Sequence, residues 1–172
     1  MKKTNNKGFS LVELIIVIAI MAILAGAIAP ALIRYIDKSR KSNDVSAAKT
    51  IKTAVETAMA NETTYELLTS GTSDPTGRIE VLPGKTQEDG VKVIVPATEA
   101  VTGSKAAAEA EIAKNIGETM PKIKYKKAAD GTNTPATWVV TCTKAGTIKV
   151  GLGKDNSGIT YELVPEICSY YQ

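Results

Sequence analysis

Few side chains in this sequence could carry out covalent chemistry. The 172 residues include no histidine. That absence removes the most common general base, the Ser-His and Cys-His nucleophile pairs, and histidine metal ligands. Acidic pairs such as Glu109 and Glu111 fall in a polar, alanine-rich segment, where nothing nearby would make either a general acid or base. We therefore predict no enzyme, no catalytic residue and no cofactor.

One segment offers a few oxygen ligands for a metal ion. The segment Gly153–Gly158 offers the side chains of Asp155, Asn156 and Ser157, whereas a calcium ion prefers six or more oxygens. An ordinary turn is the preferred interpretation, and no metal site is predicted.

Residues 122–127 contain four lysines and one tyrosine, which could face DNA or an acidic surface. Such a run is more typical of a solvated edge, so no specific nucleic-acid partner is predicted.

Glu13 is the charged residue with the least expected position. Leu14–Ile33 contains twenty residues without a charge, enough for a helix of about 30 Å that would cross the hydrocarbon core of a bilayer. A carboxylate at the edge of such a run costs roughly 2.5–3.5 kcal/mol on insertion scales and usually has a partner and a function. Residues 14–18 are all apolar, so we expect the partner of Glu13 to come from elsewhere.

The residues around Glu13 form a recognisable motif. Lys2, Lys3 and the heptapeptide Lys7-Gly8-Phe9-Ser10-Leu11-Val12-Glu13 resemble the N-terminus of a type IV pilin. The resemblance implies that a prepilin peptidase cleaves between Gly8 and Phe9 and methylates the new amine of Phe9. It also implies that this ammonium pairs with Glu13 of a neighbouring copy and sets the axial register of a helical filament.

The same resemblance implies where the chain works. A pilin precursor spans the cytoplasmic (inner) membrane once, with its leader in the cytoplasm and its C-terminal region outside. An assembly platform then adds it to an extracellular pilus. We expect a major structural subunit, in a fibre that supports surface adhesion, twitching motility or biofilm formation.

Other interpretations of the N-terminus stay open. An ordinary signal peptide would use Leu14–Leu24 as its apolar region and would release a secreted surface binding domain after cleavage near residues 25–29. An uncleaved anchor is also open. Within the pilin superfamily, a pseudopilin of type II secretion or a competence pilus subunit are alternatives. Glu13 has no use in an ordinary signal peptide, which favours the pilin interpretation.

Cleavage after Gly8 would change the charge balance. The whole chain carries 21 basic and 18 acidic residues. Removal of Lys2, Lys3 and Lys7 would leave 18 of each, so bulk charge gives no support for nucleic-acid binding. Near-neutrality favours association, which suits a polymerising subunit.

The pattern after the leader predicts one long helix. Residues 1–8 are the leader, 9–33 the membrane-spanning and filament-core part, and 34–61 an amphipathic second half that ends near Asn61. Gly26 and Pro30 interrupt the apolar run, and Pro30 removes one helical hydrogen bond. The resemblance implies that Ala22–Ala29 melts in a filament, although a tolerated kink is an equal alternative.

Residues 62–172 are expected to form a globular region of mixed structure. Composition predicts a loop over Leu68–Gly77, a helix over Ser104–Ile116 closed by Gly117, and a hairpin turn at Lys144-Ala145-Gly146. Strands are predicted over Arg78–Leu82, Val91–Val95, Lys122–Lys126 (an edge strand), Thr137–Thr143, Thr147–Leu152 and Ile159–Val164. The fold class is therefore α+β: a long N-terminal helix packed against a C-terminal antiparallel sheet.

The two cysteines fall late in the chain, at Cys142 and Cys168. In an exported protein such a pair favours one disulfide, whereas a reducing compartment would leave two thiols. The bond would close a loop of about 26 residues and resembles the C-terminal disulfide loop of many pilins.

Overall fold

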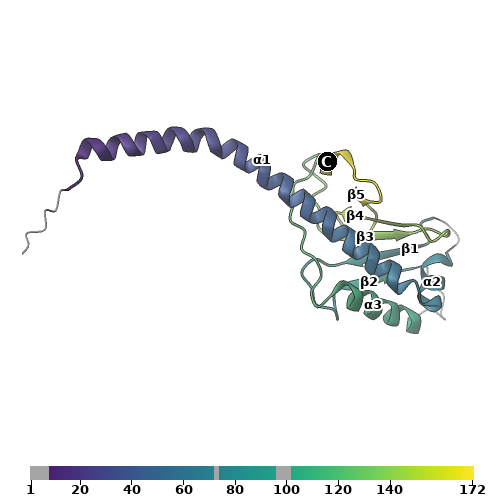
Figure 1. Ribbon diagram of the computed structural model, residues 1–172. Helices are drawn as coiled ribbons and strands as arrows, with labels where there is room; N and C mark the ends of the chain where they lie inside the picture. Colours follow the sequence, from purple (N-terminus) through teal and green to yellow (C-terminus); the bar gives the residue numbers. More distant parts are fainter. Residues whose placement is uncertain (1–7, 72–73, 96–101) are drawn as a thin grey trace, which may run out of the picture. The chain divides into compact units, whose positions relative to one another are not determined.

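The computed structural model describes residues 8–71, 74–95 and 102–172 (Figure 1). The predicted leader, apart from Gly8, lies outside the described residues. The chain divides into two compact units, Met1–Ser39 and Arg40–Gln172. We call the second unit the head and describe each unit by itself.

The first helix, α1, runs from Leu11 to Ala58 and confirms the predicted long helix. It ends before Asn61 because the amides of Ala60 and Asn61 bond to the carbonyls of Thr57 and Ala58, a tighter turn than the α-helical one. Asn61 then starts α2 (Glu62–Thr69), its side chain accepting a hydrogen bond from the Thr63 amide at 3.0 Å.

The helix α2 corrects the predicted loop over Leu68–Gly77. Leu68 and Thr69 belong to α2, and Gly77 already belongs to the first strand. The cause is hydrophobic, since Leu67 and Leu68 are buried on one side of this short helix. Residues 72 and 73 of the predicted loop lie outside the described residues.

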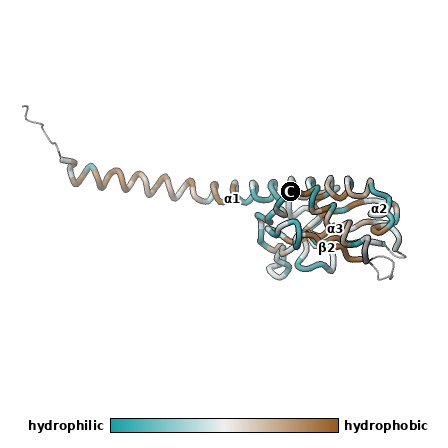
Figure 2. The backbone as a smooth tube through the Cα atoms, turned by 90° about the horizontal axis from the view of Figure 1, so that it is seen from below, coloured by the Kyte–Doolittle hydropathy of each residue, from teal (hydrophilic) through white to brown (hydrophobic). Residues whose placement is uncertain are grey.

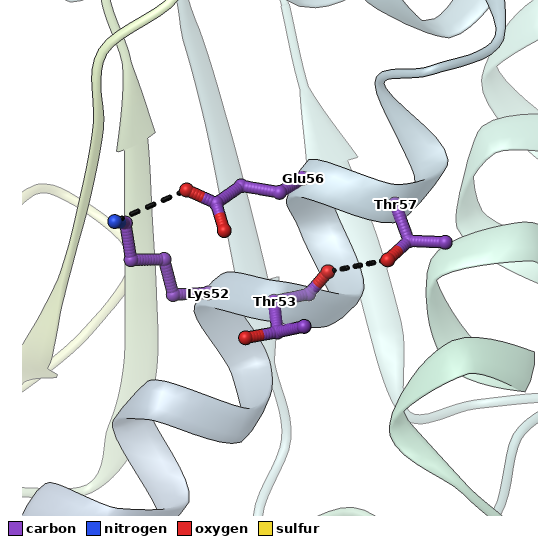
Figure 3. Close-up of polar contacts among 4 residues, drawn as sticks. All are labelled: Lys52, Thr53, Glu56 and Thr57. Carbon is purple, nitrogen blue, oxygen red and sulfur yellow. Dashed lines mark hydrogen bonds and ion pairs between the residues drawn. The ribbon is translucent and has the colours of Figure 1, made fainter.

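Within the head, α1 presents one apolar stripe to the core and a polar face to solvent. Val45, Ala48, Ile51, Val55 and Ala58 are buried at three- and four-residue spacing. On the other side, Lys52 Nζ lies 3.0 Å from Glu56 Oε1, and Thr57 Oγ1 donates to the Thr53 carbonyl at 2.8 Å (Figure 3).

The sheet beneath α1 has five antiparallel strands in the order β2-β1-β3-β4-β5. Its strands are β1 (Gly77–Val81), β2 (Val91–Ile94), β3 (Thr137–Cys142), β4 (Ile148–Gly153) and β5 (Tyr161–Val164). Each lies within two residues of a predicted strand. The predicted turn is confirmed: Gly146 has φ +78°, and its amide donates to the Thr143 carbonyl at 2.9 Å.

Alternate residues of the central strands face α1 and form the core. On β3 these are Trp138, Val140 and Cys142, each with no exposed surface. Trp138, the largest fully buried side chain, satisfies its indole N–H with the Pro121 carbonyl at 2.8 Å. The α+β prediction, a helix packed on an antiparallel sheet, is therefore confirmed (Figures 1 and 2).

The helix α3 (Thr102–Ile116) protects the edge strand β2. It ends as predicted, with Gly117 following at φ +127°. The carboxylate of Glu109 accepts a hydrogen bond from the Val93 amide at 2.7 Å, an amide on the side of β2 that no strand pairs. This acidic side chain therefore has a structural role, because it covers a free strand edge.

Replacing Glu109 by alanine is expected to destabilise the head by about 1–2 kcal/mol, because a part-buried charged hydrogen bond is lost and the Val93 amide loses its acceptor. The measurement is urea unfolding followed by the fluorescence of Trp138, the single tryptophan. Glu111→Ala, on the same helix, is the matched control and should change stability by less than about 0.5 kcal/mol. Equal effects of the two substitutions would contradict the edge-protection role.

The predicted edge strand over Lys122–Lys126 is wrong. These residues form no ladder with a neighbouring strand. The predicted alternation is nevertheless present, since Ile123 and Tyr125 are buried and the lysines are exposed. The amides of Lys124 and Tyr125 donate to the carboxylate of Asp44 on α1, so a side chain of the helix replaces a partner strand.

Candidate functional site

The junction predicted for processing is accessible. Gly8 and Phe9 precede α1, and Phe9 is 88% exposed. A Cβ added at Gly8 would meet no atom within 4 Å. The backbone between the two residues is therefore open to a protease, and the absence of a side chain at Gly8 allows close approach.

Glu13 has a partner that the sequence analysis missed. Its Oε2 accepts a hydrogen bond from the Ser10 amide at 2.9 Å. Ser10 immediately precedes α1, and Glu13 is its third residue, so Ser10-Leu11-Val12-Glu13 has the spacing of a capping box. Glu13 therefore has a local hydrogen-bond partner in the uncleaved chain, and its pairing with a Phe9 ammonium stays a prediction. The Ser10 amide that the carboxylate accepts from is the one next to Phe9, the residue whose amine cleavage would create.

The apolar run of α1 is uncovered. Large side chains from Leu11 to Ile33 are about half exposed or more; Ile15 is 51% and Ile23 is 73% exposed. By length and composition this helix could cross a membrane, and none of its most apolar window is buried (Figure 2). A surface of this extent must be covered by lipid or by protein.

Gly26 and Pro30 lie one turn apart within the same continuous helix. A Cβ at Gly26 would meet no atom within 4 Å, so the glycine is not required by close packing in the single chain. The predicted melting of Ala22–Ala29 concerns a filament and stays a prediction.

Asp44 is a buried charged residue that the sequence analysis overlooked. It has no exposed surface, and its two oxygens accept from the amides of Lys124 (2.7 Å) and Tyr125 (2.8 Å). Burial raises the pKa of its carboxyl above the ordinary value of 3.8, against the opposing effect of the two hydrogen bonds. The available signal was its position one turn before Ala48, in the apolar stripe.

Next to Asp44, a cluster of tyrosines connects the C-terminal residues to α1. Its members are Tyr125, Tyr161, Tyr170 and Tyr171, with ring centroids of neighbouring pairs 5.3–5.9 Å apart. Lys41 Nζ lies 5.1 Å from the Tyr125 ring centroid and 5.0 Å from that of Tyr170, and it donates to the Tyr170 carbonyl. The short 3₁₀ helix η2 (Ser169–Tyr171) carries two of these rings.

The two cysteines are free thiols, one buried in the core and the other partly buried at its margin. Cys142 faces the core, and its burial raises the pKa of the thiol to about 12. Cys168 follows β5 and lines a shallow hollow with Thr141 and Lys149. Cys142 belongs to β3, whereas Cys168 lies four residues after β5, with β4 between the two strands. The predicted disulfide stays a prediction.

The turn at Gly153–Gly158 is organised by an arginine. The Arg78 guanidinium donates to the carbonyls of Asn156 (3.2 Å) and Ser157 (2.6 Å), and Asp155 accepts from the Ser157 amide at 2.9 Å. The carboxylate of Asp155 and the two carbonyls thus accept hydrogen bonds from within the head, and the bond from the Ser157 amide to Asp155 forms an Asx turn. No cluster of three metal-ligating side chains occurs in the described ranges.

Comparison with known proteins bears on the N-terminal segment. Residues 3–29 match the model of the prokaryotic N-terminal methylation motif. The chain is 42% identical over 57 residues to the type IV major fimbrial protein FimA of Dichelobacter nodosus. The aligned segment covers 33% of this chain and 36% of that protein. The chain is also 46% identical over 62 residues to fimbrial protein Q of Moraxella bovis, where the aligned segment covers 36% of this chain and 40% of that protein.

These similarities cover little more than a third of either chain. The chain spans 36–40% of the length of the curated relatives it matches. No solved structure matches it. The N-terminal methylation motif of prokaryotic prepilins is thus present, and its residues include Gly8, Phe9 and Glu13.

Proposed function

We propose that this chain is the major structural subunit of a type IV pilus. The observation that carries the proposal is the methylation motif at the start of an uncovered apolar helix, which continues as the core helix of a folded head. The similarity to two fimbrial proteins over the same segment supports it. The chain acts by polymerising, and its filament serves adhesion, twitching motility or biofilm formation.

Processing is the first step of the proposed function. A prepilin peptidase cleaves between Gly8 and Phe9 and methylates the Phe9 amine. The exposure of Phe9 and the open space around Gly8 support this. The remaining chain then begins with an ammonium group close to the first turn of α1.

Assembly is the second step. Before assembly the apolar side chains of residues 11–33 lie in the membrane, where lipid already shields them from water. When these side chains pack against copies of the same helix, van der Waals contacts supply the cohesion. The hydrophobic effect adds little, because lipid had already removed the side chains from water. The Phe9 ammonium of one copy and Glu13 of its neighbour then fix axial register, since either charge buried alone costs several kcal/mol.

The alternative interpretations differ in where the chain is cut. An ordinary signal peptidase would cut near residues 25–29, inside α1, and would release a head without its apolar segment. A pseudopilin or competence subunit would be cut at the same place as a major pilin. Abundance in sheared fibres separates a major pilin from those two.

The decisive test is the intact mass and N-terminal sequence of the chain recovered from cells. We expect a chain that begins at Phe9 and carries one additional methyl group. A chain beginning near Ile28 or Pro30 would overturn the proposal in favour of a secreted binding domain. Recovery of the same processed chain in a pellet of sheared fibres is the expected second result.

A further inference from the structure

Four lysines project from one segment of the head. Lys122, Lys124, Lys126 and Lys127, which we call the lysine cluster, are all exposed. Their intervening neighbours Ile123 and Tyr125 are buried in the core. Lys122, Lys124 and Lys126 alternate with these core residues and so share the solvent side, and the exposed Lys127 follows directly.

The lysine cluster lies where α1 enters the head. The carboxylate of Asp44 accepts hydrogen bonds from the amides of Lys124 (2.7 Å) and Tyr125 (2.8 Å), and Lys41 lies over the Tyr125 ring. Lys127 Nζ lies 5.9 Å from the centroid of the same ring. The head begins at Arg40, so these contacts fix the segment to the first residues of the head.

The lysine cluster is close to the apolar run along the chain. Asp44, which accepts from the amides of Lys124 and Tyr125, follows Ile33, the last residue of the uncharged run, by eleven residues. Both residues belong to the continuous helix α1. A short stretch of helix therefore links the basic surface to the segment that would lie in the bilayer.

The charges near this surface are mostly positive. The segment 118–130 carries the four lysines against Glu118 and Asp130. Asp44, the acidic group packed beneath it, is fully buried and already accepts two amide hydrogen bonds. Arg40 and Lys41, the first two residues of the head, add further positive charge.

We propose that the lysine cluster binds anionic lipid headgroups while the chain is anchored in the membrane. This proposal rests on the membrane-anchored precursor of the proposed function. Juxtamembrane basic residues are attracted to anionic leaflets, and the attraction falls within a Debye length. The contact restrains the head against the membrane surface, and it is given up when the subunit leaves for the filament.

The test is amine labelling of the full-length chain in nanodiscs. The chain is incorporated into discs of phosphatidylcholine alone or of phosphatidylcholine with phosphatidylglycerol. Labelling rates are then read at each lysine by mass spectrometry. We expect rates at the lysine cluster to fall about threefold or more in the anionic discs and to recover in high salt. Rates at exposed lysines elsewhere on the head should stay unchanged: Lys92, Lys114 and Lys144.

Charge variants supply the matched control. K122Q/K124Q/K126Q should remove the protection of Lys127 in anionic discs, whereas K92Q/K114Q/K144Q, with the same loss of charge, should keep it. Equal labelling of the wild type in both kinds of disc overturns the proposal. Stronger protection by a duplex oligonucleotide than by anionic lipid overturns it in favour of a nucleic-acid surface.

The membrane-anchored precursor has its own readout in this experiment. Co-elution of the chain with nanodiscs reports insertion of the apolar segment and does not depend on lysine labelling. Failure to co-elute would count against the proposed function, whereas co-elution with unprotected lysines would count only against the lipid contact.

Discussion

Replacing Glu13 by glutamine is expected to lower the yield of sheared filaments by at least about tenfold, while the chain is still inserted and still cleaved after Gly8. The substitution removes the negative charge that partners the Phe9 ammonium in the proposed filament. An ammonium left unpaired in an apolar core costs several kcal/mol, and every 1.4 kcal/mol is a factor of ten. The measurement is the amount of subunit in a pellet of sheared fibres, relative to the processed subunit in the membrane.

Glutamine is the informative substitution because of the hydrogen bond between Glu13 and Ser10. A glutamine at this position of a capping box can still accept from the amide, so the start of α1 should be preserved. Glu56→Gln removes the same charge from the exposed face of the same helix and serves as the control. Wild-type filament yield with Glu13→Gln would show that the carboxylate is dispensable for assembly.

Replacing Asp44 by alanine is expected to destabilise the head by about 2–5 kcal/mol, because the amides of Lys124 and Tyr125 would lose their acceptor inside the core. The segment that carries the lysine cluster and the C-terminal tyrosines should loosen with it. Thermal or urea unfolding followed by Trp138 fluorescence measures the loss. Glu56→Ala, an exposed position on the same helix, should cost about 0.5 kcal/mol or less.

Asp44 also gives the head a defined pH dependence. Burial raises the pKa of its carboxyl above 3.8, so the native state holds this proton to higher pH than the unfolded chain does. The stabilising free energy from protonated Asp44 is fully present below the pKa that this carboxyl has in the unfolded chain. It is lost as the pH rises through the raised pKa of the native state. Asp44→Asn should remove this decline. If Asp44→Asn lost stability with rising pH as steeply as the wild type, the pH dependence would come from other groups.

The predictable parts of this structure are those that depend on local pattern. The long helix, the five strands and the Gly146 turn each rest on residues close in sequence, and all are present. The segment Lys122–Lys126 shows the limit of such reasoning. Its alternation was correctly identified, but its hydrogen-bond partner lies some 80 residues earlier on α1, and periodicity alone does not reveal that.

The candidate site divides in the same way. Gly8, Phe9 and Glu13 follow from a contiguous motif, which the family comparison also matches. The bond from Ser10 to Glu13 was available as a local capping pattern and was missed. The tyrosine cluster joins residues 41, 125, 161, 170 and 171, and only the folded chain brings them together.

The fastening of the C-terminus to Lys41 sets the order in which the head can mature during export. The contact between Lys41 and Tyr170 joins residues 129 positions apart, and β1 must wait for β3, some sixty residues later, to gain its inner neighbour. In the proposed membrane-anchored precursor, a chain exported from its N-terminus can therefore complete this contact only after its last residues have emerged. A truncated chain would lack the contact, so only the full-length chain can complete the head.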